Sequence, residues 1–315
     1  MASLITLSSK HVQNNGYNNT FRFDIPTGAA NFQNREVALA SVKMFNSQFN
    51  INDVEYGNNT FSIIVPTGST TSTINITLPN GYYSYLDLNN YIQSKLIAAG
   101  AYLIDGSGNN VFYIKMQANS TYYSCQVDLL STPTSLPASY TRPSSGLYSL
   151  SGTGLPSTAY APQIVFPANF NSIVGFSVGT YPSAQTTTSQ SILSNITPQI
   201  NPVSCYLIRC NLVNNIYSQP PDILFSFSSG GTTIGQSIDV KVNQFAWIDI
   251  PDQTKSYIEI IITDQFGRFV KFQDNQIVIQ LLIRKKIELI KVKGMKHLIN
   301  VQMIENGIFC SIFLV

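Results

Sequence analysis

Charged side chains are scarce in this chain: Lys, Arg, Asp and Glu make up 11% of its 315 residues. An average soluble domain carries about a quarter of such residues, and a surface with so few charges keeps a monomer in solution poorly. Hydrophobic residues account for 44%, which is enough to bury a sizeable core. Much of the remaining surface is therefore expected to face other protein.

Cysteine and histidine are also sparse, and their spacing fits neither a disulfide framework nor a metal site. Cys205 and Cys210 belong to one strand-like run, but their odd separation places them on opposite faces of a strand. Buried free thiols of a reducing compartment are expected instead. With only two histidines, a zinc site would need a chance convergence of ligands. The complete set is Cys125, Cys205, Cys210, Cys310, His11 and His297.

No catalytic constellation stands out. The segment 175–179 spells G-x-S-x-G around Ser177, but a nucleophile elbow needs a strand before the serine and a helix after it. Pro182 follows shortly and disfavours helical geometry in the residue before it. Asp249 and Asp252 flank a proline, a pattern typical of turn capping rather than of an acid pair or calcium ligands. No enzyme activity, metal or cofactor is predicted.

Short alternating runs dominate the chain and predict β-strands. In TFRFDI (20–25), Phe21, Phe23 and Ile25 fall on one face of a half-buried strand. Turn signals separate such runs, which favours an antiparallel sandwich, and eight or more strands with one short helix suit a single jelly roll. The other expected strands are 3–7, 36–51, 60–65, 73–78, 111–117, 122–130, 203–213, 223–228, 237–242, 245–250, 257–263, 268–272 and 276–283.

One helix is expected, at 84–99. Ser84 and Asp87 are spaced as a capping box, and Gly100 follows the last apolar position, where a C-terminal glycine belongs. Tyrosines cluster where the preceding turn enters this helix. Tyrosine combines a large contact area with tolerance of water, so an interface role competes with local packing. The aromatic residues considered for an interface are Tyr82, Tyr83, Tyr85 and Trp247.

Residues 131–162 interrupt the β pattern. Ser, Thr, Pro and Gly supply 21 of these 32 residues, too few apolar side chains for a core of their own. The segment is expected to form an extended loop and an exposed projection. We assign 1–118 and 203–283 to the jelly roll and 284–315 to a basic, then apolar, tail.

Several phrases in order resemble the penton, or minor capsid, proteins of virophages and Polinton-type double-stranded DNA viruses. The early strand ALASVKMFNSQFNI (38–51) is also similar, and the matches are scattered over about residues 20–286. The phrases that carry the resemblance are LPNGYYSYLDLNNYIQ (78–93), FNSIVGF (170–176), CYLIRCNLVNN (205–215), PPDILFSFS (220–228) and FVKFQDNQIVIQLLIRKK (269–286).

The resemblance implies a structural protein: a jelly roll that forms the homopentameric vertex of an icosahedral virion beside major capsid protein capsomers. In some members an inserted domain projects outward, and the resemblance makes 119–202 the candidate for such an insertion in this chain. Assembly would take place inside the host cell, in the cytoplasm. No signal peptide precedes residue 30, and no apolar run approaches the roughly 20 residues of a membrane span. Two rival hypotheses stay open, namely a receptor- or glycan-binding spike module and a hydrolase that uses Ser177.

The tail shows no family pattern. Six of the 18 basic residues lie in it, and its last eight residues are almost wholly apolar, so it is expected to bind something. Contact with a neighbouring capsid protein, contact with packaged DNA and a solvated edge strand are the three alternatives. The residues concerned are Arg284, Lys285, Lys286, Lys291, Lys293 and Lys296.

Overall fold

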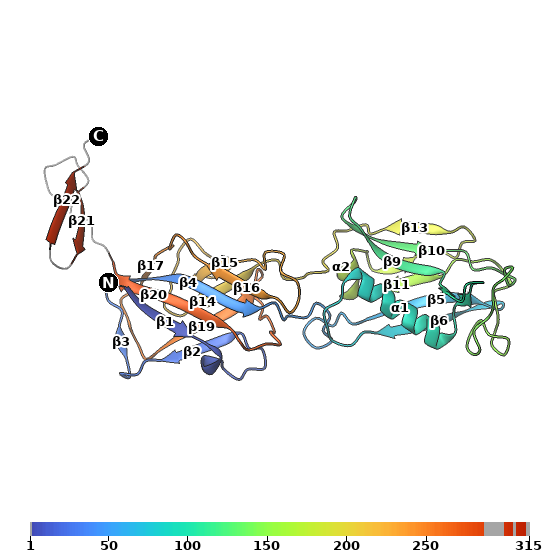
Figure 1. Cartoon of the computed structure of the whole chain (residues 1–315), viewed down its shortest axis with the longest axis horizontal. Helices are drawn as coiled ribbons and strands as arrows, with labels where there is room; N and C mark the ends of the chain where they lie inside the picture. The colour runs from blue at the N-terminus through green and yellow to red at the C-terminus, as the bar shows by residue number, and fades with distance from the viewer. Residues whose placement is uncertain (1, 287–298, 305–306, 313–315) are drawn as a thin grey trace. The chain divides into compact units, whose positions relative to one another are not determined.

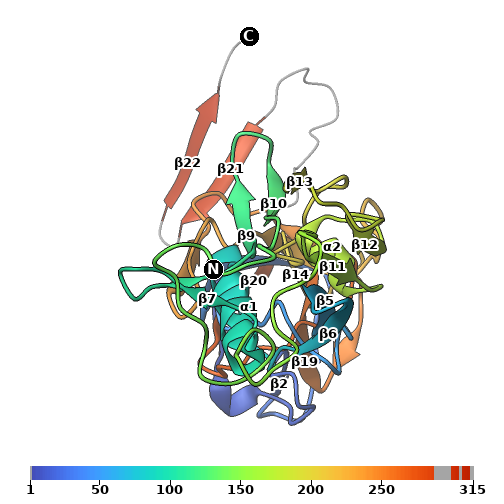
Figure 2. The same cartoon turned by 90° about the vertical axis from the view of Figure 1, so that its right-hand side faces the viewer.

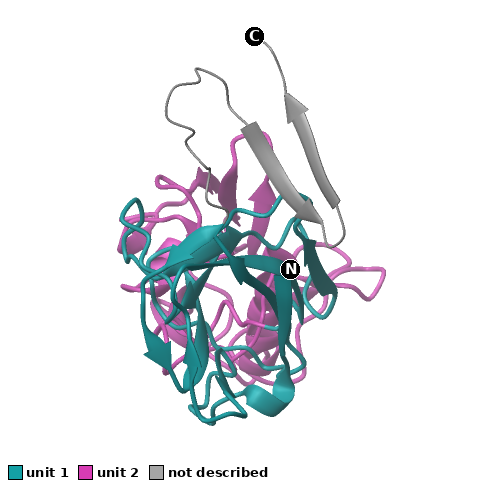
Figure 3. Ribbon diagram, turned by 90° about the vertical axis from the view of Figure 1, so that its left-hand side faces the viewer, with its two compact units in different colours: residues 1–47, 205–315 teal, residues 48–204 magenta. Residues whose placement is uncertain are grey.

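The computed structural model describes residues 2–286, 299–304 and 307–312. The chain is mostly β-strand and forms two compact units (Figure 1). Unit 1 comprises Met1–Ser47 and Cys205–Val315, and unit 2 comprises Gln48–Ser204 (Figure 3). The prediction of an all-β chain is confirmed.

Unit 1 contains two antiparallel sheets, and in each of them four strands follow one another in hydrogen-bonded order. The first has the order β1 (Ala2–Leu7), β20 (Val278–Lys285), β4 (Arg35–Phe45), β16 (Ser237–Lys241), and β17 (Ile248–Ile250) also pairs with β4. The second has the order β15 (Ile223–Phe227), β14 (Tyr206–Cys210), β19 (Tyr257–Asp264), β2 (Thr20–Asp24).

The connectivity of these eight strands is that of a jelly roll. Numbered along the chain, the first sheet reads first, eighth, third, sixth, and the second reads fifth, fourth, seventh, second. This interleaving of two Greek keys closes one core between two sheets. Unit 2 is inserted between the third strand, β4, and the fourth, β14.

The core of unit 1 follows from the alternation of its strands. Ile258, Ile260 and Ile262 of β19 are buried, as are the alternate β20 residues Ile279 and Leu281. Full burial of one such side chain stabilises the fold by about 1.5–3 kcal/mol. The expected strand at 268–272 does not form; in this stretch the structure has isolated bridges, at Phe269, which pairs with Thr263, and at Phe272.

Smaller elements complete unit 1. A 3-10 turn, η1 (Ser9–His11), follows β1, and β3 (Ala30–Asn31) pairs with β18 (Thr254–Lys255). Beyond β20 the chain forms the two-stranded sheet of β21 (Ile299–Ile304) and β22 (Gly307–Ile312).

Unit 2 has three antiparallel sheets and two α-helices around one hydrophobic core. The first sheet has the order β12 (Gly179–Tyr181), β11 (Gln163–Phe166), β5 (Thr60–Thr67), β6 (Thr70–Thr77). The second has the order β13 (Gln190–Leu193), β10 (Ser124–Leu129), β9 (Ile114–Asn119), and the third pairs β7 (Leu103–Ile104) with β8 (Asn110–Val111). The helices are α1 (Tyr85–Ala99) and α2 (Phe170–Val174). Helix α1 lies against β9 and β6 (Figure 2).

The predicted helix is confirmed at both ends. The Ser84 hydroxyl accepts a hydrogen bond from the Asp87 amide at 3.2 Å, and the Asp87 carboxylate accepts one from the Ser84 amide at 2.9 Å. The Ser84 hydroxyl also donates to the Asp87 carboxylate at 2.6 Å, and this bond, together with that from the Ser84 amide, lowers the pKa of Asp87. Gly100 ends the helix at φ +64°, a left-handed conformation that favours glycine.

An aromatic stack lies at the centre of unit 2. The Phe166 ring is 4.9 Å from Phe176 and 6.1 Å from Phe170, centre to centre. Phe61 stacks on Phe170 at 4.5 Å, and Tyr181 meets Phe176 edge-on at 4.9 Å. Offset and edge-on pairs of this kind add about 0.5–1.5 kcal/mol each beyond the burial of area.

The insertion begins earlier in the chain than expected. Residue 119 was the expected start, but 48–118 also belong to unit 2. Their strands alternate with the same period as the jelly roll, so the pattern does not reveal a different sheet. The pairing does: Ile63 of β5 lies opposite Ile164 of β11. At its other end the insertion closes at Ser204, two residues beyond the expected 202, while β20 continues through Lys285 instead of ending at 283.

The Ser/Thr/Pro-rich loop is irregular, as expected, but its centre is not an exposed projection. Tyr148 is buried, and its hydroxyl donates to the Pro66 carbonyl at 3.0 Å. The Leu147 and Tyr148 amides donate to the carbonyls of Ala99 and Gly100, both at 2.9 Å. The loop therefore packs against the end of α1, with Tyr148 as a buried anchor.

Candidate functional site

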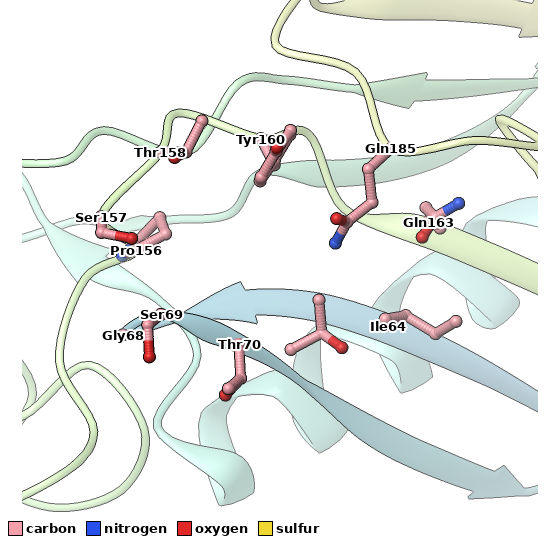
Figure 4. A pocket seen from close by; sticks show the side chains of 11 residues that line it. Ile64, Gly68, Ser69, Thr70, Pro156, Ser157, Thr158, Tyr160, Gln163 and Gln185 are labelled. Atoms are coloured by element: carbon pink, nitrogen blue, oxygen red, sulfur yellow. The ribbon is translucent and has the colours of Figure 1, made fainter.

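A polar cleft of about 590 Å³ in unit 2 is the clearest candidate for a binding site (Figure 4). Three segments that are distant in sequence form it: the β5–β6 turn with the start of β6, the 156–163 stretch that leads into β11, and the loop at Gln185. Uncharged polar side chains dominate its lining. Those that matter below are Thr70, Thr71, Ser157, Thr158, Gln163 and Gln185.

Backbone contacts hold two of these segments together. The β5–β6 hairpin closes through Gly68, whose φ of +52° is left-handed. The Gly68 carbonyl accepts a hydrogen bond from the Ser157 amide at 2.6 Å. Below the turn, the Thr67 hydroxyl donates to the Gly154 carbonyl at 2.8 Å. These bonds fix the β5–β6 turn and the neighbouring 156–163 stretch relative to each other in the absence of a ligand.

Two glutamines lie at the other wall. Gln163 is 7% exposed, and its Nε2 donates to the Pro182 carbonyl at 2.7 Å. Its Oε1 forms no hydrogen bond with any described residue. Gln185 is exposed, and Figure 4 shows its amide reaching into the space above β5. The cleft therefore offers an oriented side-chain amide on strand β11 and an exposed one on the loop.

The chemistry of this cleft is that of hydrogen bonding without charge. None of the described residues that line it is charged, so it holds no general acid or base that works near neutral pH and no carboxylate ligand for a divalent cation. The sequence pattern does not reveal this cleft, because its residues come from three separate segments. The Ser/Thr-rich composition of 131–162 was the only signal.

The first three basic residues of the expected tail lie at the end of the jelly roll. Arg284 of β20 forms an ion pair with Glu36 of β4, and its guanidinium lies 3.8 Å from the centre of the Trp247 ring. Lys286 pairs with Asp249, which raises the pKa of Lys286. Arg284 and Lys286 are thus engaged within unit 1. Lys285 is exposed, and Lys291, Lys293 and Lys296 lie outside the described residues.

Replacing Arg284 by methionine is expected to destabilise unit 1 by about 2 kcal/mol, because it leaves the Glu36 carboxylate buried and unpaired. Scanning calorimetry of the variant measures the loss. Arg22→Met is the matched control: Arg22 also contacts a ring, Tyr257, and pairs with a carboxylate, but Asp24 is exposed, so little change is expected. Equal losses in both variants would contradict the role assigned to burial.

The tyrosines near α1 and Trp247 differ in how far they are buried. Tyr83 and Tyr85 are partly buried and pack against the core of unit 2, and burial raises the pKa of both phenols. Tyr82 is 37% exposed, and its hydroxyl donates to Asn201 at 2.8 Å. Trp247 is partly buried and meets Phe245 edge-on at 5.9 Å. Tyr82 and Trp247 therefore retain surface for an interface, whereas Tyr83 and Tyr85 serve local packing.

The surroundings of Ser177 do not form a nucleophile elbow. The chain runs from helix α2 through Ser177 into strand β12, the reverse of the order that the elbow needs. The Ser177 hydroxyl accepts a hydrogen bond from Asn195 at 3.0 Å. Of the two histidines, His11 lies in unit 1 and His297 lies outside the described residues.

The other residues considered for metal binding are also separated. Asp249 pairs with Lys286, and Asp252 accepts a hydrogen bond from the Asn34 amide at 3.0 Å. In the part of the chain that the structure describes, no three His, Cys, Asp or Glu residues gather as metal ligands would. Cys125, Cys205 and Cys210 are free thiols, and burial raises the pKa of Cys210 to about 12. No helix among the described residues is long and apolar enough to cross a bilayer.

An eight-stranded jelly roll with a second β unit between its third and fourth strands defines the structural class of this protein. No family model and no curated protein matches the sequence. The chain is similar in structure to the mavirus penton protein (TM-score 0.41, 9% identity) and to a chain of the Sputnik virophage structure determined by cryo-EM (TM-score 0.41, 13% identity). Each match covers 90% of this chain and 98% of the other. At these values the likeness alone assigns no function.

Proposed function

We propose that this chain is a structural capsid protein that forms the homopentameric vertex, or penton, of an icosahedral virion. The strand order of unit 1 is the observation that carries the proposal, because a jelly roll closes its own core and leaves its outer faces and loops for neighbours. The scarcity of charge supports it, since much of the surface would be covered in a shell.

The phrases that resemble penton proteins support the same function. Three of them coincide with strands β14, β15 and β20 of the jelly roll. The other two coincide with the entry to α1 and with α2, both inside unit 2. The resemblance therefore extends to the insertion as well as to the jelly roll.

Five copies would meet head to tail around a fivefold axis, a closed cyclic arrangement in which each copy uses two different surfaces. The outer contacts would dock onto major capsid protein capsomers in the virion, after assembly in the host cytoplasm. For the residues beyond Lys286, contact with a neighbouring capsid protein is the preferred role and packaged DNA the alternative.

Light scattering of the purified full chain tests the proposal. Five copies of a 34.7 kDa chain should give a particle of about 174 kDa, and negative-stain images should show fivefold rings. Raising the ionic strength should leave the rings intact, because so few charges are available to hold them. A stable monomer or trimer across the accessible concentration range would contradict the proposal.

A further inference from the structure

We propose that the polar cleft of unit 2 is a binding site for neutral carbohydrate. Sugars present closely spaced hydroxyls, each a hydrogen-bond donor and acceptor, and they carry no charge unless modified. The cleft presents the complementary set: hydroxyls and carboxamides, which also donate and accept. Its volume of about 590 Å³ lies within the usual range of ligand sites, about 300–1,000 Å³.

Most polar side chains of the cleft form no hydrogen bond within the fold. The hydroxyls of Thr70, Thr71, Ser157 and Thr158 form no hydrogen bond with another described residue, and neither does the Gln185 amide. The backbone around them is fixed by contrast, since Ser157 is tied to the β5–β6 turn at 2.6 Å. A ligand can therefore form hydrogen bonds with these side chains without breaking any contact that stabilises unit 2.

Gln163 orients one acceptor of the cleft. The residue is 7% exposed, and its Oε1 has no hydrogen-bond partner among the described residues. Its Nε2 donates to the Pro182 carbonyl at 2.7 Å, and this bond fixes the orientation of the amide. A ligand hydroxyl can therefore donate to Oε1, a hydrogen bond that contributes about 1 kcal/mol.

The absence of charge along the described lining selects among glycans. A sialylated or sulfated sugar needs a cation to offset the desolvation of its anion, and this lining provides none. A neutral hexose or N-acetylhexosamine chain meets no such cost. Ile64 at the base and Tyr160 at the rim offer apolar surface for the carbon face of a sugar ring.

An array of immobilised neutral, sialylated and sulfated oligosaccharides, probed with the full chain, tests the proposal. Neutral glycans should bind, and the signal should not change with salt or between pH 5 and 8, because no lining group titrates there. Binding confined to sialylated or sulfated glycans, or no binding at all, would overturn it.

Variants of the lining residues test whether the glycan binds in this cleft. Thr71→Ala combined with Gln185→Ala should weaken glycan binding about tenfold or more, since each lost hydrogen bond is worth about 1 kcal/mol. Thr73→Ala is the matched control: it lies two residues along the same strand, is equally exposed, and is not part of the lining. If the double variant binds like the unchanged chain, or Thr73→Ala weakens binding equally, the assignment to this cleft is wrong.

Glycan binding and pentamer formation are tested separately. The array reports on unit 2 whatever the oligomeric state, and light scattering reports on assembly whatever the ligand. The double variant should still form the same rings as the unchanged chain, because both substitutions are at exposed side chains of the cleft.

Discussion

Phe166→Ala is expected to lower the free energy of unfolding of unit 2 by about 4 kcal/mol while leaving unit 1 nearly unchanged. Phe166 is fully buried and contacts Phe61, Phe170, Phe176 and Tyr181. Its removal leaves a cavity among rings contributed by several elements, which cannot collapse together without distorting the sheet β12-β11-β5-β6.

The chain allows the two units to be followed separately. Its one tryptophan, Trp247, belongs to unit 1, whereas α1 and α2, the α-helices of the described residues, lie in unit 2. In a urea titration, tryptophan fluorescence therefore reports on the jelly roll and the helical circular dichroism signal on the insertion. Tyr122→Ala, an exposed aromatic of unit 2, is the control and should change neither transition. A parallel shift of both signals would mean that the units unfold as one.

Gly100→Ala is expected to cost about 3 kcal/mol, again in unit 2. Two penalties combine at this position. The φ of +64° is unfavourable for alanine, and a Cβ atom would lie 2.3 Å from the Ser145 carbonyl oxygen and 2.6 Å from Gly146 Cα. Both neighbours are backbone atoms of the Ser/Thr/Pro-rich loop, so the loop would have to move away from the end of α1.

Gly108→Ala separates the two penalties. Gly108 has a similar left-handed φ of +84°, but nothing lies within 4 Å of the position of its Cβ. This variant should therefore cost only the conformational term, about 1 kcal/mol. The helical circular dichroism signal in the urea titration measures the loss of unfolding free energy in both variants. Equal losses would show that the loop gives way freely, and would contradict the close packing of Gly100 against Gly146.

Local signals were predictable from the sequence, and long-range pairings were not. Ser84, Asp87 and Gly100 lie within one short stretch and each acts on its own helix, so both ends of α1 could be predicted. The start of the insertion could not, because it depends on β5 pairing with β11 about a hundred residues away. Helix α2 was also missed, since its five residues are too few to show a period.

The same limit applies to the candidate sites. The basic residues near the C-terminus were visible, but the engagement of Arg284 depends on Glu36 on another strand. The polar composition around the cleft was visible too, whereas its shape comes from the meeting of the β5–β6 turn with the 156–163 stretch and Gln185. Composition thus indicated the kind of surface, and only the fold determined where that surface is concave.

The place where the chain leaves and re-enters the jelly roll has a consequence for how such a protein can change over time. Ser47, at the exit, accepts a hydrogen bond from the Asp274 amide at 3.1 Å, and Tyr206, just after the return, packs against Phe272 at 5.9 Å. Both junctions thus adjoin the same short stretch of unit 1. Material between them can be lengthened, replaced or reduced to a short link without altering any pairing of the eight strands. Variation in the inserted unit is therefore uncoupled from the strand pairings that hold the jelly roll together.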